Sequence, residues 1–253
     1  MNHALILPIL LPAVVGAVLV IAARHDRVLA RVFSIASMVL MLAIALGLFV
    51  LASDGSVRTY ALGAWPAPFG IVLVLDRLAA LMLLLGAVLG LGVLLYASNG
   101  WDQRGKHFHP LYQFQLMGIN GAFLTGDFFN LFVFFEILLI ASYALLLHGG
   151  GGERVRAGIH YVVLNLLGSS LFLIAVGMMY GITGTLNMAD LAVKVAAASP
   201  DDAALMGAAG LLLLVVFGLK AAFLPMYFWL PRAYAAASAP VAALFAIMTK
   251  VGL

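Results

Sequence analysis

The chain has 253 residues, of which 65% are hydrophobic and only 9% are charged, and its formal net charge is +3. A soluble domain carries about 25% charged residues. The composition therefore excludes a soluble globular protein and predicts an all-α, polytopic bundle of transmembrane helices. The positive charge comes mostly from short loops, so it indicates membrane orientation and not nucleic-acid binding. Because cysteine is absent, the sequence excludes disulfides and thiolate metal sites.

Apolar stretches long enough to cross a bilayer, for which about 20 residues are needed, follow one another along the chain. Seven of them and the start of an eighth are expected near Leu5–Ala23, Val32–Leu51, Ile71–Ala97, Leu111–Thr125, Phe128–His148, Ile159–Ile182, Leu205–Leu230 (broken at Pro225) and Pro240. The fourth carries Gln113, Gln115 and Asn120, so it is expected to face other helices. No soluble domain is expected, because the longest polar segments are only Asn187–Asp202 and Ser98–Pro110.

Positive residues are distributed unevenly between the two sets of alternate loops. One set contains Arg24, Arg27, Arg31, Arg104, Lys106, Arg154, Arg156 and Arg232. The opposite set contains only Arg58 and Lys194. Cytoplasmic loops carry the excess of Lys and Arg, so the first set is predicted to be cytoplasmic and the N-terminus is predicted to lie outside.

The eighth apolar stretch is short. Only 14 residues run from Pro240 to Leu253, too few to cross a bilayer. We therefore expect residues 1–253 to form a single transmembrane domain that stops inside its last helix. Such a chain is a fragment of a longer protein or relies on a neighbouring chain to cover that end.

The seventh stretch combines a cation with a helix break. Lys220 is expected near mid-membrane, where a lysine costs about 2.5–3.5 kcal/mol on insertion scales. Pro225 removes a backbone donor and clashes with the carbonyl of Ala221. Transporters place their ion sites at discontinuous helices of this kind, so this stretch predicts a functional site.

Glu136 is the only acidic residue expected at mid-membrane depth. Buried alone it would be protonated, whereas beside a lysine it could ionise, and Lys220 is the obvious partner. Lys250 lies on the next helix, so Glu136, Lys220 and Lys250 could form a series that passes protons across neighbouring helices. The alternatives are a static ion pair that fixes two helices, and a Lys250 that extends to the membrane interface.

Other polar residues are weaker candidates. Asp76 and Arg77 are expected to set the start of the third span. Asp127 is expected at a helix N-terminus, where its charge suits the helix dipole, with a second possibility as an outer cation-attracting group. His160 is expected at the interface, with a role on a proton route as the alternative. No residue pattern indicates a metal site or an organic cofactor.

Two segments together carry a resemblance to a known family. FFNLFVFFEILLIASYALL (128–146) and LKAAFLPMYFWLPRAYAAASAPVAALFAIMTKVG (219–252) resemble the proton-translocating antiporter-like subunits. That family includes large membrane subunits of respiratory complex I and antiporter subunits of Mrp-type cation/proton antiporters. FEILLIASYALL and GTLNMADL (184–191) look like the Mrp-type D subunit (the Mnh and Pha systems). Complex I subunits more often have a tryptophan where this chain has Phe135.

The resemblance implies a fold and a function. The family has about fourteen transmembrane helices with two inverted five-helix repeats, of which the first would span about 111–253. Its functional glutamate matches Glu136, its broken-helix lysine matches Lys220 with Pro225 at the break, and its following lysine matches Lys250. It implies a subunit of a hetero-oligomeric Na⁺ or K⁺/proton antiporter in a bacterial plasma membrane, hence a secondary transporter and not an enzyme.

Two alternative functions stay open. The first is a proton-pumping membrane subunit of a complex I-like or hydrogenase-linked oxidoreductase, whose membrane sequence could be nearly the same. The second is a structural membrane subunit whose charges only lock helices together. The sequence also leaves sodium and potassium as equal possibilities, because no cation cage can be recognised in it.

Overall fold

The computed structural model describes residues 3–23 and 26–253, and Arg24 of the orientation argument lies outside these ranges. The helices are α1 (Leu7–Ile21), α2 (Arg27–Ala52), α3 (Arg77–Ala97), α4 (Phe108–Leu124), α5 (Phe128–Leu146), α6 (Gly152–Thr183), α7 (Met188–Ala196), α8 (Pro200–Lys220), α9 (Leu230–Ala236) and α10 (Ala239–Val251). Two short antiparallel strands, β1 (Arg58–Ala61) and β2 (Val72–Leu75), form a hairpin. The fold class is the expected all-α membrane bundle.

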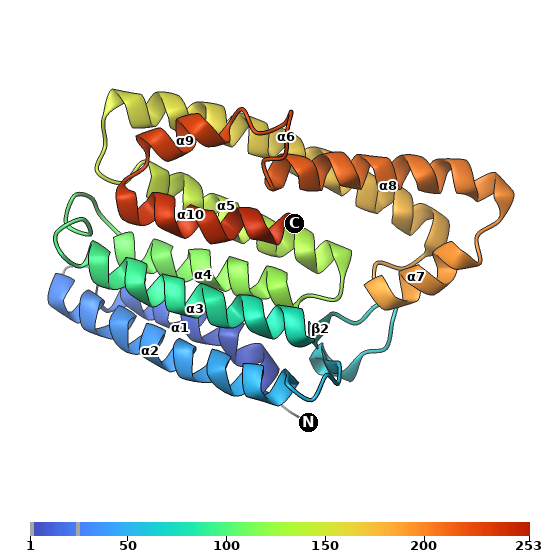
Figure 1. Ribbon diagram of the computed structural model, residues 1–253, viewed down its shortest axis with the longest axis horizontal. Coiled ribbons are helices and arrows are strands. Elements are labelled where there is room, and N and C mark those ends of the chain that lie inside the picture. The colour runs from blue at the N-terminus through green and yellow to red at the C-terminus, as the bar shows by residue number, and fades with distance from the viewer. Residues whose placement is uncertain (1–2, 24–25) are drawn as a thin grey trace.

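The long helices run side by side along one direction (Figure 1). Helices α1 to α4 form one half of the bundle, and α6 and α8 pair on the other side of α5 (Figure 1). Helix α10, the last helix of the chain, lies against α3, α4 and α5. The hairpin, the α4–α5 turn and α7 meet at one end of the bundle, called here the α7 end, where Asp127 pairs with Asn187 in a β-bridge.

Six helices of the described residues are long and apolar enough to cross a membrane: α1 with the short turn before it, α2, α3, α5, α6 and α8. Their outward faces carry many exposed valine, leucine and isoleucine side chains, as a lipid-facing surface requires. The other two expected spans correspond to α4, with 17 residues, and α10, with 13. The chain is therefore a multi-pass membrane protein, and the count of eight spans stays a prediction.

Several expected boundaries differ from the structure. The span expected from Ile71 begins as strand β2, and α3 starts only at Arg77 because Asp76 caps it by accepting a hydrogen bond from the backbone N–H of Ala79 at 2.7 Å. A short apolar run such as Val-Leu-Val-Leu is compatible with a helix and with a strand, so the sequence alone does not locate the start of α3. The polar segment from Asn187 contains a short helix, α7, which Asn187 caps.

Helix α4 is buried on nearly all sides, as its polar residues predicted. Gln113, Gln115 and Asn120 are buried, and the Asn120 side chain donates to the carbonyl of Pro8 at 2.9 Å. Gly118 allows α4 to approach α5 closely, since a Cβ at this position would lie 2.6 Å from the backbone nitrogen of Leu138. Small residues at such crossings let helix backbones meet in membranes.

Replacing Gly118 with alanine is expected to lower the stability of the folded protein by about 1–3 kcal/mol, because the added methyl group must push two helices apart. Thermal melting of the detergent-solubilised complex checks this. Gly47→Ala is the matched control, since nothing lies within 4 Å of its Cβ position, and alanine is the better helix former. Equal melting temperatures for both variants would contradict the close α4–α5 contact.

Candidate functional site

Lys220 is the last residue of α8, and its side chain is only 5% exposed. The chain turns without regular helix until Leu230, and Pro225, which lacks a backbone N–H, lies inside this segment. Helical hydrogen bonding therefore stops before the proline that was expected to interrupt it. The Trp229 indole N–H donates to the carbonyl of Leu219 at 2.8 Å, which satisfies one of the acceptors left at the helix end.

Close packing of α6 on α8 brings a serine to Lys220. A Cβ on Gly168 would lie 2.8 Å from a methyl group of Leu219, so the glycine leaves room for that side chain. The next residues along each helix are Ser169 and Lys220. The Lys220 ammonium donates to the Ser169 hydroxyl at 3.1 Å.

Ser169 in turn connects Lys220 with Glu136. The Ser169 hydroxyl donates to the Glu136 carboxylate on α5. Among the residues that the structure describes, Glu136 and Lys220 form no direct ion pair within 4.0 Å. The lysine also lies 4.8 Å from the centre of the Phe135 ring, at cation–π distance. The structure thus brings the two expected partners together through a hydroxyl that the sequence analysis did not single out.

Four phenylalanines pack on the side of this site that faces the α7 end. Phe172 lies edge-on to Phe132 and Phe135, with ring centroids 6.0 Å apart in each case, and 5.5 Å from Phe217. On α5, Phe132 and Phe135 precede Glu136. On α6, Phe172 follows Ser169, and on α8, Phe217 precedes Lys220. Each of these directions leads towards the α7 end of the bundle. We call this cluster the phenylalanine layer.

The opposite side of the site is richer in hydroxyl groups. Ser142 and Tyr161 share a hydrogen bond of 2.8 Å, and both are fully buried. The neighbouring Tyr143 hydroxyl has no hydrogen-bond partner in the part of the chain described. A buried polar atom without a partner marks a place where an ordered water is expected. The site therefore lies between an apolar layer and a region that can accept water.

Lys250 does not join this group through its side chain, which is exposed on the last turn of α10. The helix end itself lies close to the site. A Cβ on Gly252 would be 2.7 Å from the backbone nitrogen of Ala221, the residue after Lys220. The end of α10 thus lies beside the residue that follows Lys220 while the Lys250 side chain is exposed, and the part of Lys250 in a proton series stays a prediction.

The two accessory candidates lie away from the site. Asp127 caps α5 by accepting the backbone N–H of Asn130 at 2.8 Å, which is the expected helix N-terminal position. Burial raises the pKa of the Asp127 carboxyl, although backbone hydrogen bonds oppose this. His160 is half-buried on α6, with its ring 6.5 Å from that of Phe228. No group of three or more His, Cys, Asp or Glu side chains that could hold a metal ion occurs in the described ranges.

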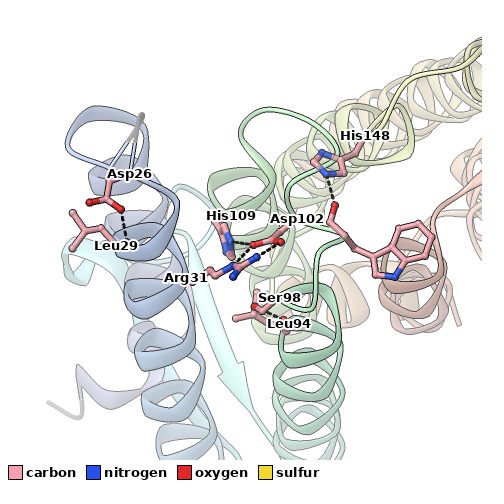
Figure 2. A network of polar contacts seen from close by, with 9 residues as sticks. Asp26, Leu29, Arg31, Leu94, Ser98, Asp102, His109 and His148 are labelled. Atoms are coloured by element: carbon pink, nitrogen blue, oxygen red, sulfur yellow. Dashed lines mark hydrogen bonds and ion pairs between the residues drawn. The ribbon is translucent and has the colours of Figure 1, made fainter.

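A second polar network, at the end opposite α7, was missed by the sequence analysis. Arg31 on α2 forms a two-pronged ion pair with Asp102 at 2.5 and 2.7 Å, and His109 contacts the same carboxylate at 3.1 Å (Figure 2). Nearby, His148 contacts the carbonyl of Trp101 at 3.0 Å (Figure 2). Burial alone would raise the pKa of Asp102, but hydrogen bonds from Arg31 and His109 outweigh it and hold that pKa below its usual range. This network ties α2 to the α3–α4 connection.

Comparison with known protein families identifies the family of this chain. The sequence model described as NADH:quinone oxidoreductase/Mrp antiporter, TM, matches residues 125–253, the half of the chain that contains Glu136, Ser169, Lys220 and Lys250. The chain belongs to this family. Members of the NADH:quinone oxidoreductase/Mrp antiporter family are membrane subunits, in agreement with the apolar helices described above.

Individual relatives point to the Mrp branch of the family. The chain is 52% identical to the D subunit of a probable K⁺/H⁺ antiporter from Rhizobium meliloti (strain 1021), with 100% of this chain and 48% of the relative covered. It is 45% identical to the D subunit of the Na⁺/H⁺ antiporter from Alkalihalophilus pseudofirmus, covering 100% and 51%. In the Mrp complex from Dietzia sp. DQ12-45-1b, one chain superposes with a TM-score of 0.91 at 34% identity, covering 100% and 47%. The chain spans about half the length of these relatives.

Proposed function

We propose that the chain is part of the D subunit of a Mrp-type antiporter, in which inward proton movement drives monovalent cations outward across a bacterial plasma membrane. The observation that carries this is the buried Lys220 at the end of α8, joined through Ser169 to Glu136. Charged side chains at membrane depth are costly, so those that occur there usually have a function. The partners would be the other subunits of the complex, the bilayer, protons and Na⁺ or K⁺.

In this proposal the proton moves between groups whose charge states depend on one another. A proton on Lys220 favours an ionised Glu136, and loss of that proton favours a neutral carboxylic acid. Lys250, on the helix whose end lies against Ala221, would exchange protons with Lys220 when the remaining half of the subunit covers it. Residues 111–253 would form the first of two inverted repeats, with the N-terminus outside the cell.

The experiment uses inverted vesicles from cells without other antiporters that carry the genes for all subunits of the complex. Respiration acidifies the vesicle interior, and a pH-sensitive dye follows the gradient after NaCl or KCl is added. The proposal expects one of the two salts to collapse the gradient, which also identifies the cation. Vesicles with every subunit except this one serve as the control and should show no response.

A second candidate is the proton-pumping arm of a redox complex, because the family includes NADH:quinone oxidoreductase subunits. In that case neither salt would affect the gradient. The purified complex would instead pump protons while it reduces a quinone or oxidises hydrogen. The relatives named as antiporter subunits favour the first candidate.

A further inference from the structure

We infer that the Ser169 hydroxyl is the group through which a proton passes between Lys220 and Glu136. This inference rests on the proposed antiport function and adds a residue to it. Ser169 is 5% exposed and, among the described residues, is the only side chain that forms a hydrogen bond with both charged groups. The two charged side chains themselves stay more than 4.0 Å apart at their nearest nitrogen and oxygen.

The chemistry of the three groups fixes the direction of both hydrogen bonds. An ammonium group only donates, and an ionised carboxylate only accepts, whereas a hydroxyl has one proton to donate and two lone pairs. The hydroxyl must therefore accept from Lys220 and donate to Glu136. Every bond of the chain then points from the lysine to the glutamate, which is the arrangement that a proton transfer in this direction requires.

The transfer balances within these three residues. An N–H bond of Lys220 breaks as an O–H bond forms on Ser169, while the original O–H bond of Ser169 breaks and an O–H bond forms on Glu136. The products are a neutral amine and a neutral carboxylic acid, and Ser169 is again a hydroxyl. Its new proton now points towards Lys220, so the hydroxyl must rotate before a second proton can pass in the same direction.

Removing the hydroxyl should leave a gap that water fills poorly. Ser169→Ala deletes one oxygen, and the space left is smaller than a water molecule needs. Lys220 and Glu136 would then have no continuous hydrogen-bonded connection. A purely structural serine, in contrast, would act only through assembly or stability of the complex.

The test measures cation-driven proton exchange in vesicles that carry the complete complex, with the amount of each subunit measured by immunoblotting. Ser169→Ala is expected to lower the maximal exchange rate at least about tenfold, at unchanged amounts of each subunit and an unchanged cation concentration for half-maximal rate. Ser169→Thr keeps the hydroxyl and should recover most of the rate. Ser170→Ala is the matched control, because Ser170 is exposed and its hydroxyl donates to its own helix, at Leu166.

The outcomes separate this inference from the proposed function. If the wild-type complex exchanges cations for protons and Ser169→Ala does so at the wild-type rate, a proton-passing role for Ser169 is wrong while antiport stands. The proton-passing role is also wrong if the Ser169→Ala defect is explained by loss of the complex from the membrane. It is equally wrong if Ser169→Thr assembles normally but shows the same full defect. If the wild-type complex shows no exchange, the proposed function itself fails.

Discussion

Lys220→Ala is expected to abolish cation-driven proton exchange, with a loss of at least about 100-fold, while the complete complex still assembles in the membrane. The lysine is 5% exposed and is the positive end of the Lys220–Ser169–Glu136 connection. Dye-monitored exchange in vesicles measures the rate, and co-purification of the other subunits measures assembly. Exchange that persists in Lys220→Ala would support the structural role considered from the sequence.

Two further variants sharpen this result. Lys220→Arg should be inactive as well, because a guanidinium keeps its proton and cannot release it to Ser169. Lys194→Ala should exchange at the wild-type rate, since the Lys194 side chain on α7 is 40% exposed and, among the described residues, forms an ion pair with Asp190 of the same helix alone. Glu136→Gln, which keeps the shape of the side chain and removes its charge, should match Lys220→Ala.

Arg31→Ala is expected to cost about 3 kcal/mol of stability, because it leaves a buried carboxylate with His109 as its remaining partner. The Asp102 side chain is only 2% exposed, whereas that of Arg31 is 27% exposed. The midpoint of thermal unfolding of the solubilised complex measures the effect. Arg31→Ala combined with Asp102→Ala should recover part of the loss, since the unpaired charge is then absent.

Arg58→Ala is the control for this prediction. Arg58 pairs with Asp54 at 2.7 Å, but the Asp54 side chain is 53% exposed. Exposed ion pairs contribute about 0–1 kcal/mol, so the melting temperature should hardly change. A loss as large as that of Arg31→Ala would show that burial of Asp102 is not what makes its ion pair important.

The same ion pair has a pH dependence with a definite sign. The folded protein holds the pKa of Asp102 below its ordinary value of 3.8, so the unfolded chain binds more protons in this range. Stability from Asp102 is therefore complete above about pH 3.8 and is lost as the pH falls below it. Arg31→Ala should flatten this acid-side decline.

The sequence predicts the large features because each depends on local composition. Apolar length predicts the long helices, and a charged residue inside such a length points directly to Glu136 and Lys220. Ser169 gives no comparable signal, since serine is common in membrane helices and an exposed neighbour, Ser170, follows it in the chain. Only the packing of α6 on α8 at Gly168 distinguishes the two serines.

The interactions that the sequence did not predict join residues far apart in the chain. From their positions in the sequence, Arg31 and Asp102 were expected in two separate loops. Nothing in either segment indicates that these loops meet. The strand Val72–Leu75 also depends on a distant partner. Its apolar sequence suits a helix or a strand, and only its pairing with Arg58–Ala61 makes it a strand. Both errors are failures to foresee tertiary contacts.

The phenylalanine layer also has an electrical consequence. Electric potential falls mainly across the least polarisable part of its path, and the hydroxyl-lined side of the site can hold water whereas the four rings cannot. Were water to connect that side with the aqueous phase, a charge on Lys220 would be electrically close to it. With water on the hydroxyl side, most of the voltage would fall across the rings, at about 2.3 kcal/mol per charge for 100 mV. The step that carries a proton past Phe172 would therefore be the voltage-sensitive step of transport.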